Sequence, residues 1–340
     1  MAVGILGYGV YTPRLSIRAE EYSRCWGAFA APGVREKRVM SYDEDPITMA
    51  IEATLESFKA VKAKTDQLRY LYFASTTSPY EEKSISAIVA VALGATSDVR
   101  TADFSASPRA GTSALLAALE AAPLLGGGCA VAVASDAPLA APDSELEHAN
   151  GAAAVSLVVG SERPIAVLTA TYSMAAETMG ERFRRRGQRY TSDLGLRMSF
   201  MQDGMTWAVQ GLLAKAGVRS KEIQHVAYYQ PDGRGVSKIL NNLGFGKEQL
   251  AAGEIASSLG NIGAASTLLS LTRVLEKAEP GQRIMVVGYG CGGEAFLLDV
   301  ESDIVAFRNE LPSFETSQSK EYVDYLEYLK IRRFLSSRSI

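Results

Sequence analysis

A turn before a helix of small residues is the part of this sequence best placed to do chemistry. The stretch 101-TADFSASPRAGTSALLAALEAA-122 predicts a strand, a tight turn and a helix rich in Ala and Leu. A helix start exposes free N–H groups and the positive end of the helix dipole, which favour a nucleophile or an anion. The turn itself offers only Ser105, Ser107, Pro108 and Arg109. It is therefore a reactive site, a site without its nucleophile, or an ordinary helix start.

Ser107 has no base close to it in sequence. A serine nucleophile needs an adjacent base, and the two histidines, His148 and His225, both lie far along the chain. A serine in front of a proline more often shapes a turn or caps a helix. His148, in the stretch 145-ELEHANG-151, is either a surface residue or a base of the site, and the sequence leaves both interpretations open.

Two polar loops follow predicted strands, where α/β proteins commonly bind ligands. The loop 74-ASTTSPYEEK-83 carries Glu81 and Glu82, which are candidate bases. The segment 226-VAYYQPDGR-234 ends a strand at Tyr229, just before a Pro-Asp-Gly turn. A tyrosine has an ordinary pKa of about 10, so it donates a hydrogen bond readily but acts as a base only when its pKa is lowered.

Two glycine-rich segments complete the candidate site. They are 258-SLGNIGAAS-266, which carries Asn261, and 288-GYGCGGEAF-296, which carries Gly290 and Cys291. Glycine lets backbone N–H groups approach an oxyanion or a phosphate closely. Cys291 is the one cysteine of the three in such a setting, and we expect the other two to pack in the interior.

The composition excludes several classes of protein. The 340 residues are 47% hydrophobic and 21% charged, with a net charge of −3, which predicts a globular protein without a broad nucleic-acid surface. No apolar run reaches the roughly 18–20 residues that span a bilayer, and the N-terminal MAVGILGYGVYTPR predicts a first strand and not a signal peptide. Three widely spaced cysteines and two histidines make neither a disulfide framework nor a metal site. We therefore expect a cytoplasmic protein that binds no metal.

The one dense basic run, 182-RFRRRGQR-189, allows two interpretations. It is a solvated helix face, or it is a site for an anionic ligand such as a nucleotide phosphate. Four basic side chains near the predicted site are candidates for such contacts: Arg109, Arg184, Arg185 and Lys238.

Apolar strands alternate with helical stretches along the chain, which predicts an α/β fold with a largely parallel sheet. The predicted strands are Val3–Tyr8, Tyr70–Ala74, Ala130–Ala134, Ala153–Val159, Ile165–Thr171, His225–Tyr229, Ile284–Gly288 and Ala295–Val300. The predicted helices are Thr48–Lys62, Ser86–Leu93, Thr112–Ala121, Gly204–Ala216 and Ser266–Lys277.

An internal echo predicts that the chain consists of two similar halves. The segments 111–136 and 263–290 match at a constant offset of 153, for example at Ser113 and Ser266. Each reads as a small-residue helix start, an apolar helix, a glycine turn and a buried strand. We therefore expect the two helices to pack against each other, with their starts facing one central site. The predicted halves are 1–164 and 165–340, the second with an amphipathic C-terminal tail.

Motifs spread over nearly the whole chain carry a resemblance to a known family. They are 4-GILGYGVYTPR-14, 33-GVREKRVMSYDED-45, 102-ADFSASPRAGTSAL-115, 230-QPDGR-234, 243-LGFGKEQL-250, 260-GNIGAAS-266, 281-GQRIMVVGYGCGGEAF-296 and 322-YVDYLEYLKIRR-333. Together they resemble the archaeal and bacterial 3-hydroxy-3-methylglutaryl-CoA synthases of the thiolase superfamily. The resemblance implies a thiolase-like duplicated αβαβα five-layer fold, which agrees with the echo. It also implies a coenzyme A thioester as substrate, no cofactor bound by the chain, and a dimer.

The resemblance places the catalytic groups of the family on residues that cannot all play the same roles. The cysteine that accepts the acyl group falls on Pro108, or on Ser107 if the register is shifted by one residue. The family histidine falls on Tyr229 and the family glutamate on Thr76, while the asparagine is retained as Asn261. Because proline cannot carry an acyl group, we do not expect a covalent acyl-enzyme.

A first hypothesis is an enzyme that acts on acyl-CoA thioesters without covalent catalysis. An aldol or retro-aldol reaction passes through a thioester enolate, which Tyr229 and Asn261 would stabilise together with backbone N–H groups near Gly290 and Cys291. The reaction also needs a base for the hydroxyl group. The candidates for the base are Tyr229, His148, Glu81 and Glu82.

The alternative hypothesis is a non-catalytic subunit beside an active thiolase or synthase. The resemblance suggests a homodimer or a thiolase-like heterodimer, with a small zinc-ribbon/OB-fold protein as a further partner; no nucleic acid and no membrane span are expected. The tail Tyr322–Phe334 is predicted to place one apolar face on its own domain or on a partner. The residues of that predicted face are Tyr322, Tyr325, Leu326 and Leu329.

Overall fold

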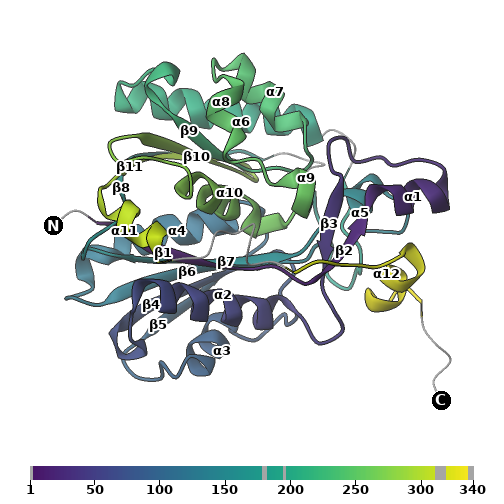
Figure 1. Cartoon of the computed structure of the whole chain (residues 1–340), viewed down its shortest axis with the longest axis horizontal. Coiled ribbons are helices and arrows are strands. Elements are labelled where there is room, and N and C mark those ends of the chain that lie inside the picture. The colour runs from purple at the N-terminus through teal and green to yellow at the C-terminus, as the bar shows by residue number, and fades with distance from the viewer. Residues whose placement is uncertain (1–2, 178–181, 194–196, 311–318, 336–340) are drawn as a thin grey trace.

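The chain folds into five alternating layers of helices and sheet (Figure 1). The computed structural model describes residues 3–177, 182–193, 197–310 and 319–335. All eight predicted strands and all five predicted helices are present, with ends that differ by a few residues, except that the fourth helix begins seven residues earlier, at Arg197. The five-layer prediction is therefore confirmed in its architecture.

One mixed sheet of nine strands runs through the molecule, in the order β5-β4-β6-β7-β1-β8-β11-β10-β9. The strands on the first side are β5 Arg100–Phe104, β4 Leu68–Ala74, β6 Cys129–Asp136, β7 Ala153–Gly160 and β1 Gly4–Tyr11. Those on the second side are β8 Ala166–Ala175, β11 Gly292–Val300, β10 Arg283–Tyr289 and β9 His225–Tyr228. The two sides meet where β1 pairs with the first residues of β8. The division into halves at residue 164 stays a prediction.

The prediction of a largely parallel sheet is wrong. Only β4–β5, β4–β6 and β9–β10 pair in parallel, and the other five neighbouring pairs are antiparallel. The physical reason lies in the connections, because parallel neighbours need a long crossover. The strands β10 and β11 are joined by Gly290 and Cys291 alone, so they must form an antiparallel hairpin.

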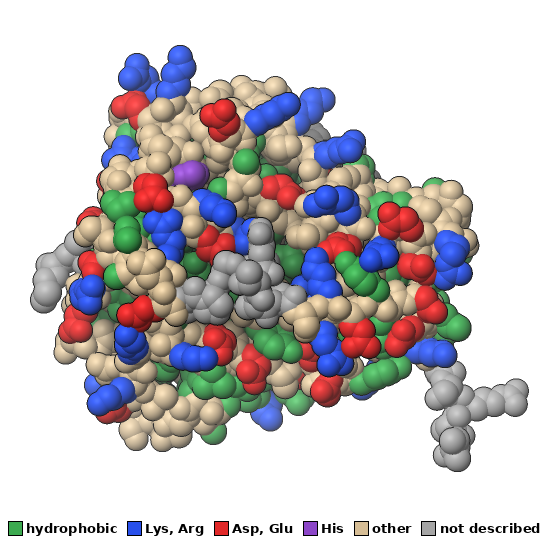
Figure 2. Space-filling view, viewed as in Figure 1, with side chains coloured by type: hydrophobic (Ala, Val, Ile, Leu, Met, Phe, Trp, Pro, Cys, Tyr) green, Lys and Arg blue, Asp and Glu red, His purple; other side chains and the backbone are tan. Residues whose placement is uncertain are grey.

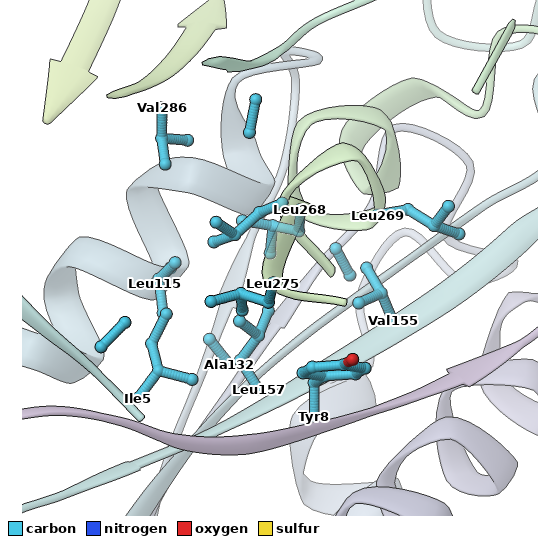
Figure 3. Close-up of a cluster of buried hydrophobic side chains, with 14 of the residues drawn as sticks. Ile5, Tyr8, Leu115, Ala132, Val155, Leu157, Leu268, Leu269, Leu275 and Val286 are labelled. Carbon is cyan, nitrogen blue, oxygen red and sulfur yellow. The ribbon is translucent and has the colours of Figure 1, made fainter. Parts of the chain in front are cut away.

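Two buried helices fill the central layer between the two sides of the sheet. They are α4 Ala110–Ala121 and α10 Ser266–Leu275, as the sequence echo predicted. Figure 3 shows Leu115 of α4 close to Leu268 and Leu275 of α10, over the strands that carry Ile5 and Leu157. A Cβ atom added at Gly111 would lie 2.1 Å from the carbonyl oxygen of Ala264, so only glycine permits this approach.

Other helices cover the outer faces of the sheet. One outer layer holds α2 Pro46–Val61 and α3 Ile85–Ala92, and the opposite one holds α6 Arg197–Ala216, α7 Gly235–Asn242 and α8 Lys247–Ala251 (Figure 1). Local residues determine where α2 begins. The Asp45 carboxylate accepts the backbone N–H groups of Ile47 and Thr48, and a proline occupies the first helical position. Figure 2 shows basic and acidic side chains interspersed over the visible face.

A small subdomain lies at one end of the layers (Figure 1). It contains the three-stranded sheet β12-β2-β3 and three short helices. The members are β2 Leu15–Arg18, β3 Glu36–Val39, β12 Glu321–Tyr322, α1 Ala19–Trp26, α5 Glu145–Ala149 and α12 Tyr325–Ile331. None of the helices in the described part of the chain is long and apolar enough to cross a membrane.

The predicted apolar face of the C-terminal tail is wrong in two of its four members, Tyr322 and Leu326, whereas Tyr325 is buried and Leu329 packs against the same apolar cluster. The carboxylate of Asp324 caps the helix, so α12 begins only at Tyr325, and Tyr322 pairs in a strand with β2. The buried side chains of α12 are Tyr325, Tyr328 and Ile331, while Leu326 is exposed. The tail packs on its own domain through this face.

Replacing Gly111 with alanine should destabilise the protein. The new methyl group would push α4 away from the backbone of Ala264, and overpacking of this kind costs about 1–3 kcal/mol. Gly246→Ala is the matched control, because its Cβ would have nothing closer than 3.6 Å, and it should cost less than about 1 kcal/mol. Urea unfolding measures both, and equal stability of the two variants would contradict the close approach.

Candidate functional site

A cavity of about 860 Å³ opens beside the start of α4. It is lined from four regions of the chain: the loop after β4, the turn before α4, the segment after β8, and the turn between β10 and β11. Seven residues singled out in the sequence line it: Thr76, Glu81, Ser105, Pro108, Arg184, Arg185 and Cys291. The structure therefore gathers side chains that are up to 215 positions apart in sequence.

Pro108, and not Ser107, faces the cavity. Pro108 is buried and lines the cavity wall. The hydroxyl of Ser107 accepts the backbone N–H of Arg109 at 3.2 Å. A Cβ atom added at Gly290 would lie 1.8 Å from that hydroxyl oxygen, so Ser107 points at the glycine turn. Neither Pro108 nor Ser107 therefore offers a nucleophile to the cavity, whereas Ser105 of the same turn is exposed and lines it.

Cys291 is exposed at the same cavity, in the turn between β10 and β11. Its backbone is left-handed, with φ of 46°. The other two cysteines differ in their surroundings. Cys129 is buried in β6, where burial raises the pKa of its thiol to about 11. Cys25 is exposed on α1, so the prediction that it packs in the interior is wrong.

A buried carboxylate, Asp136, holds the loop that carries Thr76. Its oxygens accept the hydroxyls of Ser75 at 3.2 Å and Thr76 at 2.7 Å, and also the hydroxyl of Thr77. On the opposite side Asp136 accepts the backbone N–H of Ala264 at 2.8 Å. One side chain therefore ties the polar loop after β4 to the turn just before α10.

Tyr229 and Asn261 lie together in the interior. The side-chain amide of Asn261 donates to the phenol oxygen of Tyr229 at 3.4 Å, and the two residues are 1% and 3% exposed, respectively. The Tyr229 ring stacks on Tyr289 with centroids 6.3 Å apart, and Tyr289 leads directly into Gly290. No acceptor is found among the described residues for the hydroxyl hydrogen of Tyr229. Neither residue lines the described cavity.

The structure places His148 elsewhere. It lies on α5 and is 2% exposed, and its ring stacks on Phe29 at 5.1 Å and contacts Tyr22 at 4.6 Å. Its Nδ1 atom accepts the backbone N–H of Ala30 at 2.9 Å, and burial lowers its pKa to about 4. His148 is therefore held neutral in an aromatic cluster and does not line the cavity.

The basic run at 182–189 is not a helix face. Phe183 and Ser192 exchange backbone hydrogen bonds of 2.8 and 2.9 Å, and the chain turns at Gly187, whose φ is 77°. The side chains of this arginine hairpin line the cavity, which agrees with the alternative interpretation of an anion site. The hairpin arginines in the cavity wall are Arg182, Arg184, Arg185 and Arg186.

Four other predicted site residues do not line the cavity, namely Gly290, Arg109, Lys238 and Glu82. Arg109 donates to the carbonyl oxygens of Met174 at 2.9 Å and Gly293 at 3.5 Å, so its guanidinium is engaged with strand backbone. Lys238 is exposed on α7, and Glu82 is exposed in the loop after β4. Glu81, by contrast, lines the cavity and faces Arg186 at 3.5 Å.

Sequence reasoning missed two buried carboxyl groups near the site. Asp136 ends the apolar run CAVAVASD, and a charged residue at the end of such a strand was a usable signal. Glu294 lies in β11 within reach of Ser173 at 3.2 Å and Ser113 at 3.4 Å, and burial raises its pKa. Within the described residues, no group of three or more His, Cys, Asp or Glu side chains could hold a metal ion.

Comparisons with known proteins identify the family of the chain. The family model for the C-terminal part of 3-oxoacyl-[acyl-carrier-protein] synthase III matches residues 213–298. The hydroxymethylglutaryl-CoA synthase of Thermococcus onnurineus is 32% identical over 345 residues, which covers 97% of this chain and 96% of the relative. That of Archaeoglobus fulgidus is 33% identical over 345 residues and covers 97% and 98%.

A solved structure shows the same fold at lower sequence identity. MvaS in complex with 3-hydroxy-3-methylglutaryl coenzyme A superposes with a TM-score of 0.88 at 21% identity, over 98% of this chain and 92% of the other. The fold and the extent of these matches agree. The chain belongs to the hydroxymethylglutaryl-CoA synthase family of the thiolase superfamily.

Proposed function

We propose that this chain acts on acyl-CoA thioesters without forming an acyl-enzyme, by making or breaking a carbon–carbon bond. The observation that carries the proposal is Pro108 in the cavity wall at the start of α4, where the family resemblance calls for a cysteine. A chain that cannot hold the acyl group covalently can still stabilise a thioester enolate. The relatives named above make the thioester class of substrate the natural one.

The reaction proposed for the cleavage direction starts from a β-hydroxyacyl-CoA. A carboxylate removes the hydroxyl proton, the Cα–Cβ bond breaks, and its electron pair passes to the thioester as an enolate. The carbonyl fragment leaves, and the enolate takes up a proton at Cα to give the shorter acyl-CoA. Glu81 is the proposed base, because it is the one predicted base that lines the cavity.

Tyr229 and Asn261 are the proposed donors to the enolate oxygen. The phenol of Tyr229 already accepts a hydrogen bond from Asn261, so its own hydrogen remains for a ligand. Preorganised donors in a site shielded from water contribute strongly to the stabilisation of a developing oxyanion. The thioester carbonyl would lie between the cavity and this pair, where Tyr289 connects Tyr229 to the turn at Gly290 and Cys291.

The phosphates of coenzyme A are proposed to contact the exposed arginines of the hairpin. Arg184 and Arg185 line the cavity, and a guanidinium pairs well with phosphate. Arg109 is not proposed for this role, because its guanidinium is engaged by the backbone of β8 and β11. Lys238 is not proposed either, since it does not line the cavity.

A second candidate function is a non-catalytic subunit of a larger assembly. The observation that favours it is the deep burial of Tyr229 and Asn261, which neither line the cavity nor meet solvent. In that case the chain would form a homodimer or pair with a cysteine-bearing homologue, and a zinc-ribbon/OB-fold protein would complete the assembly.

The purified chain should cleave 3-hydroxy-3-methylglutaryl-CoA to acetyl-CoA and a carbonyl compound. Tyr229→Phe should lower kcat by roughly 100-fold, because removal of one donor to an oxyanion has effects of this size. Tyr228→Phe is the matched control, since it removes a neighbouring buried phenol that has no role in the proposal. Liquid chromatography of the CoA esters measures turnover. An inert chain that copurifies with a cysteine-bearing homologue would support the subunit instead.

No covalent acyl intermediate should accumulate during turnover. The cavity wall offers Pro108 at the position where the family resemblance calls for a cysteine, and Ser107 points at Gly290. Intact-protein mass spectrometry after incubation with acetyl-CoA should show unmodified chain, and Cys291→Ser should retain activity. An acetyl group trapped on Ser107 or Cys291 would contradict the non-covalent mechanism.

A further inference from the structure

We propose that Arg182 is a specificity residue that selects acyl groups carrying a carboxylate of their own. The inference rests on the proposed function, because it takes the ligand to be an acyl-CoA thioester in the cavity at the start of α4. It adds the residue that recognises the carboxylate end of the acyl group and makes that carboxylate a requirement for tight binding.

The wall that carries Arg182 is an ordered part of the fold. Beside it, Phe183 pairs with Ser192 through two backbone hydrogen bonds. Thr191, which precedes Ser192, donates its backbone N–H to the carbonyl oxygen of Leu139 at 2.9 Å. This hydrogen bond anchors the hairpin to the segment after β6. The arginine side chains are therefore presented from a defined backbone.

The cavity carries an excess of positive charge. Four arginines and two glutamates, Glu81 and Glu177, are among its lining residues, so the formal excess is 4 − 2 = 2 charges. One of these glutamates, Glu81, already lies 3.5 Å from Arg186. That pair is largely exposed and contributes little. The lining as a whole suits an anionic ligand.

Arg182 differs from the other hairpin arginines in its surroundings. Arg184, Arg185 and Arg186 are exposed, whereas Arg182 is half-buried. Its Nη1 atom is buried and has no hydrogen-bond partner among the described residues. A buried donor without a partner is costly, and the cost is larger for a charged group. A ligand oxygen in the cavity would remove this cost.

The position of Arg182 identifies the part of the ligand that it meets. The exposed arginines stand where the highly charged phosphates of coenzyme A can keep contact with water. Arg182 is less exposed and lines the same cavity as the buried Pro108, at the helix start beside which the proposed function places the thioester. The planar guanidinium fork matches a carboxylate in two parallel hydrogen bonds. The ligand class is therefore an acyl-CoA whose chain ends in a carboxylate.

A matched pair of ligands tests the inference. Glutaryl-CoA and its methyl ester have the same acyl chain, but only the first carries a carboxylate. Isothermal titration calorimetry of the wild-type protein should show that glutaryl-CoA binds at least about 10-fold more tightly, as expected for one charge-assisted hydrogen bond. Arg182→Gln should bring the two affinities together by weakening glutaryl-CoA alone, and Arg182→Lys should restore part of the difference.

Arg219→Gln is the control for a loss of surface charge, because Arg219 is exposed and pairs with Glu222 away from the cavity. It should leave both affinities unchanged. If Arg182→Gln weakens both ligands and free coenzyme A alike, Arg182 is a coenzyme A contact and the inference is wrong. Equal wild-type affinity for the two ligands overturns the inference alone. A wild-type protein that binds neither ligand overturns the proposed function, and the inference with it.

Discussion

The close approach of two helix starts at the centre of the molecule is the constraint on which the rest of the site depends. Gly111 at the start of α4 lies so near the carbonyl oxygen of Ala264 that no side chain fits between them. This contact brings together two turns that lie about half the chain apart, and with them Pro108 and Asn261. Because both helices are buried between two sides of one sheet, the turns cannot shift independently. The packing of the core therefore fixes the geometry of the site.

Asp136 extends this constraint to the loop after β4. Its carboxylate accepts hydrogen bonds from three side-chain hydroxyls of that loop and from the backbone of Ala264. A buried carboxylate is tolerated only when its oxygens are satisfied in this way. The family resemblance calls for a glutamate at position 76, but the structure has a threonine there, and its hydroxyl donates a hydrogen bond to Asp136. Glu81, further along the same loop, is the carboxylate of this loop that lines the cavity.

The sequence predicted the buried strands and helices well, and the short strands, the strand directions and the places of single side chains poorly. Long apolar strands such as β6 and the central helix α10 are fixed by hydrophobic pattern, and both were found. The short strand β3 Glu36–Val39 was missed, because its four residues include the basic side chains Lys37 and Arg38 and carry no apolar run. Strand direction was misjudged because it depends on the connections between strands.

His148 could not be placed from the sequence, since its neutral state follows from burial among aromatic partners that come from α1 and the loop after it. The cavity members Thr76 and Pro108 came from family resemblance, whereas Arg182 as a distinct group required the structure.

The choice between an enzyme and a subunit without activity turns on which buried polar groups are satisfied. A scaffold loses nothing when a buried polar pair is replaced by apolar residues of the same shape, and it gains nothing from a donor left without an acceptor. Most buried polar groups around the site are paired, as Asp136 shows. Among the exceptions, the hydroxyl hydrogen of Tyr229 and the Nη1 atom of Arg182 have no acceptor among the described residues. Both lie near the start of α4, one in the interior behind Tyr289 and one in the cavity wall. Unsatisfied donors at these two places cost stability in the empty protein, and a bound acyl group that offers an enolate oxygen and a carboxylate would satisfy both.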